Sequence, residues 1–212
     1  MRRALKIFVL LFVSFSFSSC IELVEEININ PDLSGEYHLY IEQNSLTRLL
    51  NAFNDNIDLS ELQTRLQILK QQEGISQLIT DINPKKGRFA IRFHFADAQS
   101  LTRAFYTSLG AKKQFYNKAF LKVNSRRIKR PNLTPYLVKY AESKDLQLST
   151  QSHKFLDYLD YSYRVTSSKN IKSAHPPTSE QYLNQRHYIQ RYTVKDLLVN
   201  EQSTKSIIRL RN

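Results

Sequence analysis

The chain has 212 residues, with 31 lysines and arginines against 19 aspartates and glutamates, so its formal net charge is +12. This length suits one domain with a buried core, or at most two small ones. Cys20 is the single cysteine, which excludes a disulfide within the chain and leaves packing to hold the fold. The four glycines are widely separated, which excludes the glycine-rich loops of nucleotide-binding proteins.

The first twenty residues have the pattern of a secretory signal peptide. A basic start precedes an apolar run at residues 7–17, which is too short to cross the ~30 Å of hydrocarbon in a bilayer. The sequence Phe17-Ser18-Ser19-Cys20 then resembles a bacterial lipobox, with Phe17 where leucine is usual. The resemblance implies that residues 1–19 are a lipoprotein signal peptide and that Cys20 is a diacylglyceryl cysteine with palmitate-type chains. This lipid would anchor a single domain, residues 20–212, in a membrane.

An alternative remains for this segment. An ordinary signal peptide could be cut elsewhere, which would leave Cys20 as a free thiol or as a buried cysteine. The position of the sole cysteine, where the apolar run meets the rest of the chain, favours the lipoprotein interpretation.

The residues after Cys20 predict a β-hairpin. Apolar residues alternate at 21–30 and again at 36–43, and the turn-forming sequence from Asn30 to Gly35 separates the two stretches. Because the first strand begins next to the cysteine, little spacer is left. We therefore expect the domain to lie close to the membrane.

Two helices are expected next. Leucines at helical spacing predict one helix at 46–53, capped by Asn44 or Ser45. A second helix, with a capping box from Asp58 and Glu61, ends at Gly74 and carries Leu62, Leu66 and Leu69. We expect both leucine stripes to face the core.

A strand pair and a third helix follow. The strands lie at 75–83 and 88–95, and Asp97 caps the helix, which ends at Gly110. We expect Gly35 and Gly87 in hairpin turns, and Gly74 and Gly110 just after helices, where positive φ is favoured. This order predicts an α+β fold with helices packed on one face of an antiparallel sheet.

The segment 98–141 contains ten bases and no acid. Its candidate residues for binding an anionic surface are Lys112, Lys113, Arg126, Arg127, Lys129 and Arg130. Tyr116, Phe120 and Tyr136 are interleaved, which would suggest nucleic acid in a cytosolic protein, but export argues against that partner. The alternative is a solvated loop and helix face. Near its end, Thr134 and Pro135 predict a helix N-cap and first turn.

The last third of the chain is predicted to be β-rich. Strands are expected around 155–165, at Ile171, within 182–192 and at 207–210, with a helical turn at Val194–Leu198. Tyrosines are concentrated here, namely Tyr158, Tyr161, Tyr163, Tyr182, Tyr188 and Tyr192. They could stack on sugar rings or contact a partner, but a half-buried sheet favours tyrosine without any ligand.

Motifs for enzyme chemistry are sparse. The five histidines are scattered without metal-ligand spacing, and no nucleophile elbow is present. His153, Asp157 and Asp160 could form an acid–base cluster, but such spacing is commonplace. We therefore expect no catalytic residue, no metal and no cofactor.

The layout of the chain resembles that of small envelope lipoproteins of Bacteroidota-type bacteria, with a hairpin after the cysteine, a phenylalanine-rich strand before a helix and a short final strand. The resemblance implies a localisation and transfers no site residue. Ile21 is not the aspartate that retains lipoproteins at the inner membrane, and Glu22, Glu25 and Glu26 lie within a predicted strand instead of a compact acidic run. We expect the periplasmic face of the outer membrane.

The favoured interpretation is a non-enzymatic envelope lipoprotein that binds or scaffolds. Its partners would be the membrane through the lipid, and an anionic lipid, a glycan or an envelope protein through the basic segment. The alternative is a lipid-anchored hydrolase whose site is assembled from distant residues.

Overall fold

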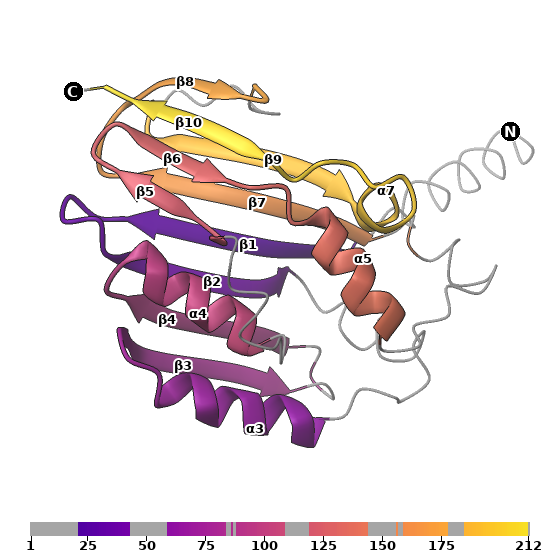
Figure 1. Ribbon diagram of the computed structural model, residues 1–212. Coiled ribbons are helices and arrows are strands. Elements are labelled where there is room, and N and C mark those ends of the chain that lie inside the picture. The colour runs from indigo at the N-terminus through magenta and orange to yellow at the C-terminus, as the bar shows by residue number, and fades with distance from the viewer. Residues whose placement is uncertain are drawn as a thin grey trace, which may run out of the picture.

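The computed structural model describes residues 21–42, 59–83, 86, 88–108, 119–143, 156, 159–177 and 185–211. In this part of the chain the α+β class is confirmed, with two sheets and four helices (Figure 1). The larger sheet has six strands in the order β3 (Ile75–Asn83), β4 (Arg88–Phe95), β2 (Gly35–Glu42), β1 (Ile21–Ile29), β7 (Leu159–Ser167) and β9 (His187–Thr193). The smaller sheet has four strands in the order β5 (Lys122–Asn124), β6 (Arg127–Arg130), β10 (Ser206–Leu210) and β8 (Ile171–His175).

The predicted hairpin after Cys20 is confirmed, and β1 pairs antiparallel with β2. In its turn, Ser34 N donates to Asp32 Oδ1 at 3.1 Å, and the residue with positive φ is Leu33, at 71°. The prediction of positive φ at Gly35 was wrong. A Cβ there would collide with the carbonyl oxygen of Asn28 and the ring of Phe95, so close packing is what requires glycine.

The sequence predicted an antiparallel sheet, but the six-stranded sheet contains one parallel pair. β1 and β7 run parallel along their full length, from Ile21 opposite Leu159 to Ile29 opposite Ser167. A parallel pair needs a long crossover. The chain between β1 and β7 contains four strands of the two sheets besides β2, together with α3, α4 and α5. Because β1 lies between β2 and β7, it is a central strand, with Ile21 at one end of the sheet and Ile29 at the other.

Helices α3 (Leu59–Lys70) and α4 (Ala98–Ser108) pack together beside β3 and β4. The predicted core face of α3 is confirmed, because Leu69 is buried and Leu62 and Leu66 are half-buried. The predicted cap of α4 is also present, since Ser100 N donates to Asp97 Oδ1 at 2.6 Å. This hydrogen bond lowers the pKa of Asp97.

The four-stranded sheet covers the part of the larger sheet that α3 and α4 leave open. Figure 1 shows it, together with α5 (Thr134–Ser143), on the same side of the larger sheet as those two helices. One core cluster joins all the layers and includes Leu101 of α4, Ile128 of β6, Val165 of β7 and Ile208 of β10. The β-rich C-terminal third and the helical turn, α7 (Val194–Leu198), are confirmed. The hairpin β5–β6, within the basic segment, was not predicted.

The start of α5 differs in detail from its prediction. Thr134 is the first residue of α5, and its hydroxyl donates to the carbonyl oxygen of Gln202 at 2.6 Å instead of accepting from a backbone N–H of the helix among the described residues. The side chain of Asn132 accepts instead, from Thr134 N and from Thr204 N, both at 3.2 Å. The start of α5 is thereby fastened to the segment before β10.

Several predictions lie outside the described residues. Among the predicted elements and turns, these are the helix at 46–53, the capping residue Asp58 and the glycines Gly87 and Gly110. No helix in the described part of the chain has the length and apolar character needed to cross a membrane.

We expect Gly35→Ala to lower the free energy of unfolding by about 1–3 kcal/mol, because the added methyl group meets a backbone oxygen that cannot move freely. Urea denaturation measures the change. Gln67→Ala, on the exposed side of α3, is the control and should stay within about 0.5 kcal/mol of the parent. A Gly35→Ala protein as stable as that control would contradict the packing argument.

Candidate anion-binding site

The outer face of the four-stranded sheet is basic because its strands alternate between aliphatic and basic residues. On β6, Ile128 points into the core while Arg127 and Lys129 are exposed. On β10, Ile208 and Leu210 are buried and Arg209 is exposed. The stretches 122–130, 171–175 and 206–211 contain no aspartate or glutamate, so no acid of these strands neutralises this face.

Two pairs of like charges lie directly opposite each other on this face. Arg127 pairs in register with Arg209, and Lys122 pairs with Lys129. Cross-strand pairs of like charge are destabilising, by up to about 1 kcal/mol each. The sheet would be more stable with a carboxylate or a neutral residue in one member of each pair, so this arrangement is one that a bound anion would relieve.

The bases converge on a hollow at one end of the sheet, which we call the basic groove. It has a volume of about 830 Å³ and is lined by Arg126, Arg127, Lys172, Arg209, Leu210 and Arg211. All five of its bases are exposed, and none forms an ion pair within the described part of the chain. Leu210 N donates to the carbonyl oxygen of Arg126 at 2.9 Å, which holds the β5–β6 turn against β10.

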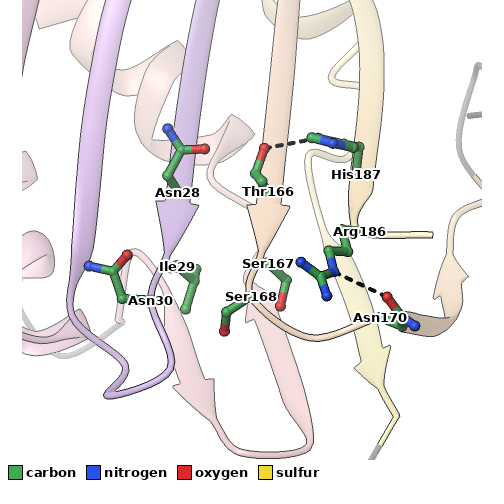
Figure 2. A pocket seen from close by; sticks show the side chains of 9 residues that line it. All are labelled: Asn28, Ile29, Asn30, Thr166, Ser167, Ser168, Asn170, Arg186 and His187. Atoms are coloured by element: carbon green, nitrogen blue, oxygen red, sulfur yellow. Dashed lines mark hydrogen bonds between the residues drawn. The ribbon is translucent and has the colours of Figure 1, made fainter. Parts of the chain in front are cut away.

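A second hollow, of about 600 Å³, lies at the ends of β1, β7 and β9, and we call it the polar pocket. Figure 2 shows its lining, which is rich in amide and hydroxyl groups: Asn28, Ile29, Asn30, Thr166, Ser167, Ser168, Asn170, Arg186 and His187. The guanidinium of Arg186 is oriented by Asn170, whose Oδ1 accepts from Nε at 3.2 Å. Thr166 Oγ1 lies 3.1 Å from His187 Nδ1.

The basic groove and the polar pocket are neighbours. Arg211, in the groove, donates its backbone N–H to the carbonyl oxygen of Asn170, in the pocket, at 2.8 Å. Lys169 Nζ also reaches the carbonyl oxygen of Ser125, in the β5–β6 turn, at 3.1 Å. Ser168 N bonds to the carbonyl oxygen of Ile29 at 3.0 Å, so both hollows lie at the Ile29 end of the larger sheet.

The six bases proposed from sequence are only partly brought together. Arg126 and Arg127 line the basic groove, and Lys129 is exposed on the same face of the sheet. Lys112 and Lys113 lie outside the described residues, as does Cys20.

Arg130 must be removed from this set. Its side chain is 3% exposed, because it has the same parity on β6 as Ile128 and points between the two sheets. There Nη2 lies 2.9 Å from Glu25 Oε2 of β1 and donates to the hydroxyl of Tyr161 at 2.9 Å.

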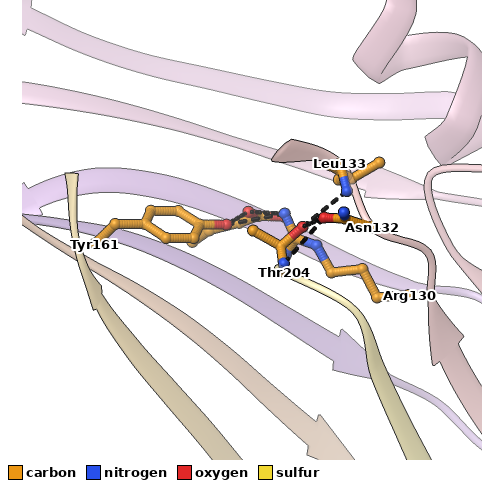
Figure 3. A network of polar contacts seen from close by, with 6 residues as sticks. Arg130, Asn132, Leu133, Tyr161 and Thr204 are labelled. Atoms are coloured by element: carbon orange, nitrogen blue, oxygen red, sulfur yellow. Dashed lines mark hydrogen bonds and ion pairs between the residues drawn. The ribbon is translucent and has the colours of Figure 1, made fainter. Parts of the chain in front are cut away.

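Figure 3 shows the hydrogen bond between Arg130 and Tyr161, and two further aromatic rings complete the surroundings of the guanidinium. The guanidinium carbon lies 4.0 Å from the ring centre of Tyr163 and 5.1 Å from that of Phe120, which is cation–π geometry. Burial raises the pKa of the Tyr161 hydroxyl well above its ordinary value, so this group stays protonated and donates to Glu25 Oε2. Arg130 therefore has a structural role and is unavailable to an external anion.

The structure adds bases that sequence reasoning missed, namely Lys172, Arg209 and Arg211 in the groove and Arg186 in the pocket. They are far from the basic segment in the sequence, and composition over a window cannot find them. A usable signal was the alternation of basic and aliphatic residues in Arg127-Ile128-Lys129 and in Ile208-Arg209-Leu210-Arg211, which is typical of strands with one basic face.

The tyrosine cluster belongs to the core. Tyr161, Tyr163, Tyr188 and Tyr192 are each at most 7% exposed, so these four rings are not a surface for stacking sugars. Tyr158 and Tyr182 lie outside the described residues, as do His153 and Asp157 of the weighed acid–base cluster. Burial, and then the charge of Glu22, raise the pKa of Asp160. The described residues contain no group of three or more potential metal ligands.

Comparisons with known proteins give little guidance. No protein-family model and no curated protein matches the sequence. Among solved structures, the folded domain of LppM from Mycobacterium tuberculosis aligns over 91% of this chain and 90% of its own, with 11% identity and a TM-score of 0.41. A likeness this weak carries no argument about function, which must come from the site.

We expect Arg130→Met to lower the free energy of unfolding by about 3–5 kcal/mol, because it leaves the Glu25 carboxylate buried without its cation. Glu25→Met combined with Arg130→Met should recover most of that loss, since Glu25 Oε1 and Arg130 Nε and Nη1 lack hydrogen-bond partners among the described residues. Urea denaturation of the two single variants and the double variant gives the coupling energy. Additive losses would show that the two side chains do not depend on each other.

Proposed function

We propose that this protein is a lipid-anchored envelope protein that binds an anionic ligand through the basic groove and catalyses no reaction. The observation that carries the proposal is the convergence of five exposed bases, from three separate parts of the chain, on one hollow. Guanidinium groups bind carboxylates and phosphates through paired hydrogen bonds, and four of the five bases are arginines.

The balance of energies supports a binding role over a merely solvated face. A solvated face gains nothing from placing Arg127 directly opposite Arg209, and this contact costs stability. An anion bound between them would change the repulsion into two attractions. The site is therefore better suited to its bound state than to its free state.

The anchor proposal rests on the first twenty residues. Residues 1–19 would be removed as a lipoprotein signal peptide, and Cys20 would carry the lipid next to Ile21, the first residue of β1. The acidic residues that follow serve the fold, since Glu25 is buried and Glu22 lies 3.3 Å from Arg164 and 3.5 Å from Arg191. They do not form an exposed acidic run of the kind associated with surface export, which supports the periplasmic face of the outer membrane as the location.

We expect Cys20→Ser to abolish lipid attachment and to leave the protein as an uncut precursor or release it from the membrane. Metabolic labelling with a fatty acid, followed by membrane fractionation, makes the measurement. The parent should carry the label in the membrane fraction. Fatty-acid label on the serine variant would contradict the assignment of Cys20 as the lipidation site.

We expect Arg126, Arg127, Lys172 and Arg209, changed together to glutamine, to weaken the binding of inorganic polyphosphate by about a hundredfold or more, at ~1 kcal/mol per base near an anionic surface. Fluorescence anisotropy at 0.1 M salt measures the affinity. We call the protein with all four substitutions the groove variant. Because the four side chains are exposed, the protein should remain folded.

A remote variant with the same change in net charge is the control. It replaces Lys70, Lys86, Arg88 and Arg92 with glutamine, on α3 and the β3–β4 side of the molecule, where they are exposed. Its affinity for polyphosphate should stay close to that of the parent. Equal losses in the two variants would mean that net charge alone governs binding, and the groove would then not be a site.

A further inference from the structure

We propose that the basic groove and the polar pocket together bind an acidic polysaccharide, and that they do so on the side of the domain that faces away from its own lipid anchor. The protein would then link its membrane to a carboxylate-bearing glycan of the cell envelope. The inference rests on the proposed function and adds to it the class of ligand and the direction in which the ligand is bound.

The direction follows from the course of β1. This strand has nine residues from Ile21 to Ile29, and at about 3.3 Å per residue its ends are about 26 Å apart. Cys20 is bonded to Ile21, whereas the groove and the pocket are tied to the Ile29 end through Ser168, Asn170 and Arg211. Figure 1 shows the start of β1 and the C-terminal end of β10 at opposite ends of the molecule.

This separation exceeds the reach of electrostatic attraction to the anchoring membrane. In the orientation that we propose, β1 stands along the membrane normal. The Debye length is about 8 Å at physiological ionic strength, so a bilayer at the Ile21 end would then be about three Debye lengths from the groove. The headgroups that hold the lipid anchor are therefore too far away to be the ligand. The anion must come from a structure on the other side of the domain.

The class of ligand follows from the pairing of the two hollows. A sugar chain carries hydroxyl groups, which amide and hydroxyl side chains such as Asn28, Thr166 and Asn170 can bind. An acidic sugar also carries carboxylates, which the arginines of the groove bind through two parallel hydrogen bonds. Hollows of about 600 and 830 Å³ lie within the size range of small-molecule sites. A simple polyanion would use the groove alone, whereas a glycan would use both.

The test uses the full lipidated protein reconstituted in neutral phosphatidylcholine vesicles. Fluorescent polygalacturonate is the acidic glycan, dextran the neutral glycan and polyphosphate the polyanion without sugar rings. Sedimentation of the vesicles then measures how much of each probe is captured. We expect capture of polygalacturonate and polyphosphate and no capture of dextran.

A pocket variant separates the glycan from the simple anion. Asn28→Ala with Arg186→Lys leaves the net charge unchanged and removes an amide and a guanidinium fork from the pocket. It should weaken capture of polygalacturonate at least fivefold and leave polyphosphate within twofold, whereas the groove variant should weaken both. If the pocket variant leaves both probes unaffected, the glycan inference is overturned while the anion-binding function stands. If neither probe binds the parent, both are overturned.

A separate experiment with anionic vesicles tests the direction of binding. Vesicles containing 30% phosphatidylglycerol should capture polygalacturonate through the protein as well as neutral vesicles do, after subtraction of vesicles without protein. If anionic vesicles suppress the capture of polygalacturonate by the parent, and the groove variant binds phosphatidylglycerol headgroups less strongly than the parent does, the groove binds its own membrane. That result would overturn the proposal that the ligand lies on the far side.

Discussion

The buried ion pair between Glu25 and Arg130 is the contact on which the arrangement of the two sheets depends. Glu25 lies on the central strand β1, and Arg130 is the last residue of β6 in the smaller sheet. Each side chain is at most 4% exposed, so separating the two would leave a charge in the core. The pair therefore fixes how the smaller sheet lies on the larger one, and the rings of Phe120 and Tyr163 hold the guanidinium in place.

The same contact decides which residues form the basic face. With Arg130 inside, the two-residue period of β6 places Ile128 inside and Arg127 and Lys129 outside. A slip of one residue would bury those two bases and expose Ile128, at a large cost in free energy. The register of β10 follows, because Arg209 pairs with Arg127. The buried pair of Glu25 and Arg130 thus determines that Arg127 and Arg209 lie opposite each other on the outer face.

Sequence reasoning predicted local structure well where residues alternate or repeat at helical spacing. The hairpin β1–β2, the pair β3–β4, α3, α4 and the strands of the last third were all found, because each element carries its own pattern. The parallel pairing of β1 with β7 and the gathering of β5, β6, β10 and β8 into a second sheet were not. Those pairings join segments far apart in the chain, and no local pattern encodes them.

The sequence predicted that the candidate site is basic, but not which residues form it or where it lies in the fold. Composition identified a basic segment, and Arg126, Arg127 and Lys129 are exposed on the basic face. Arg130 was assigned to the surface because counting charges ignores strand parity, while Lys172, Arg209 and Arg211 were missed because the second sheet was not foreseen. The position of the groove depends on the direction of β1 and β7, which carry the chain from the Ile21 end to the Ile29 end together. In the proposed role, tethering and binding would occupy different ends of the molecule, and β1 would separate the proposed anchor at Cys20 from the groove by about 26 Å of backbone.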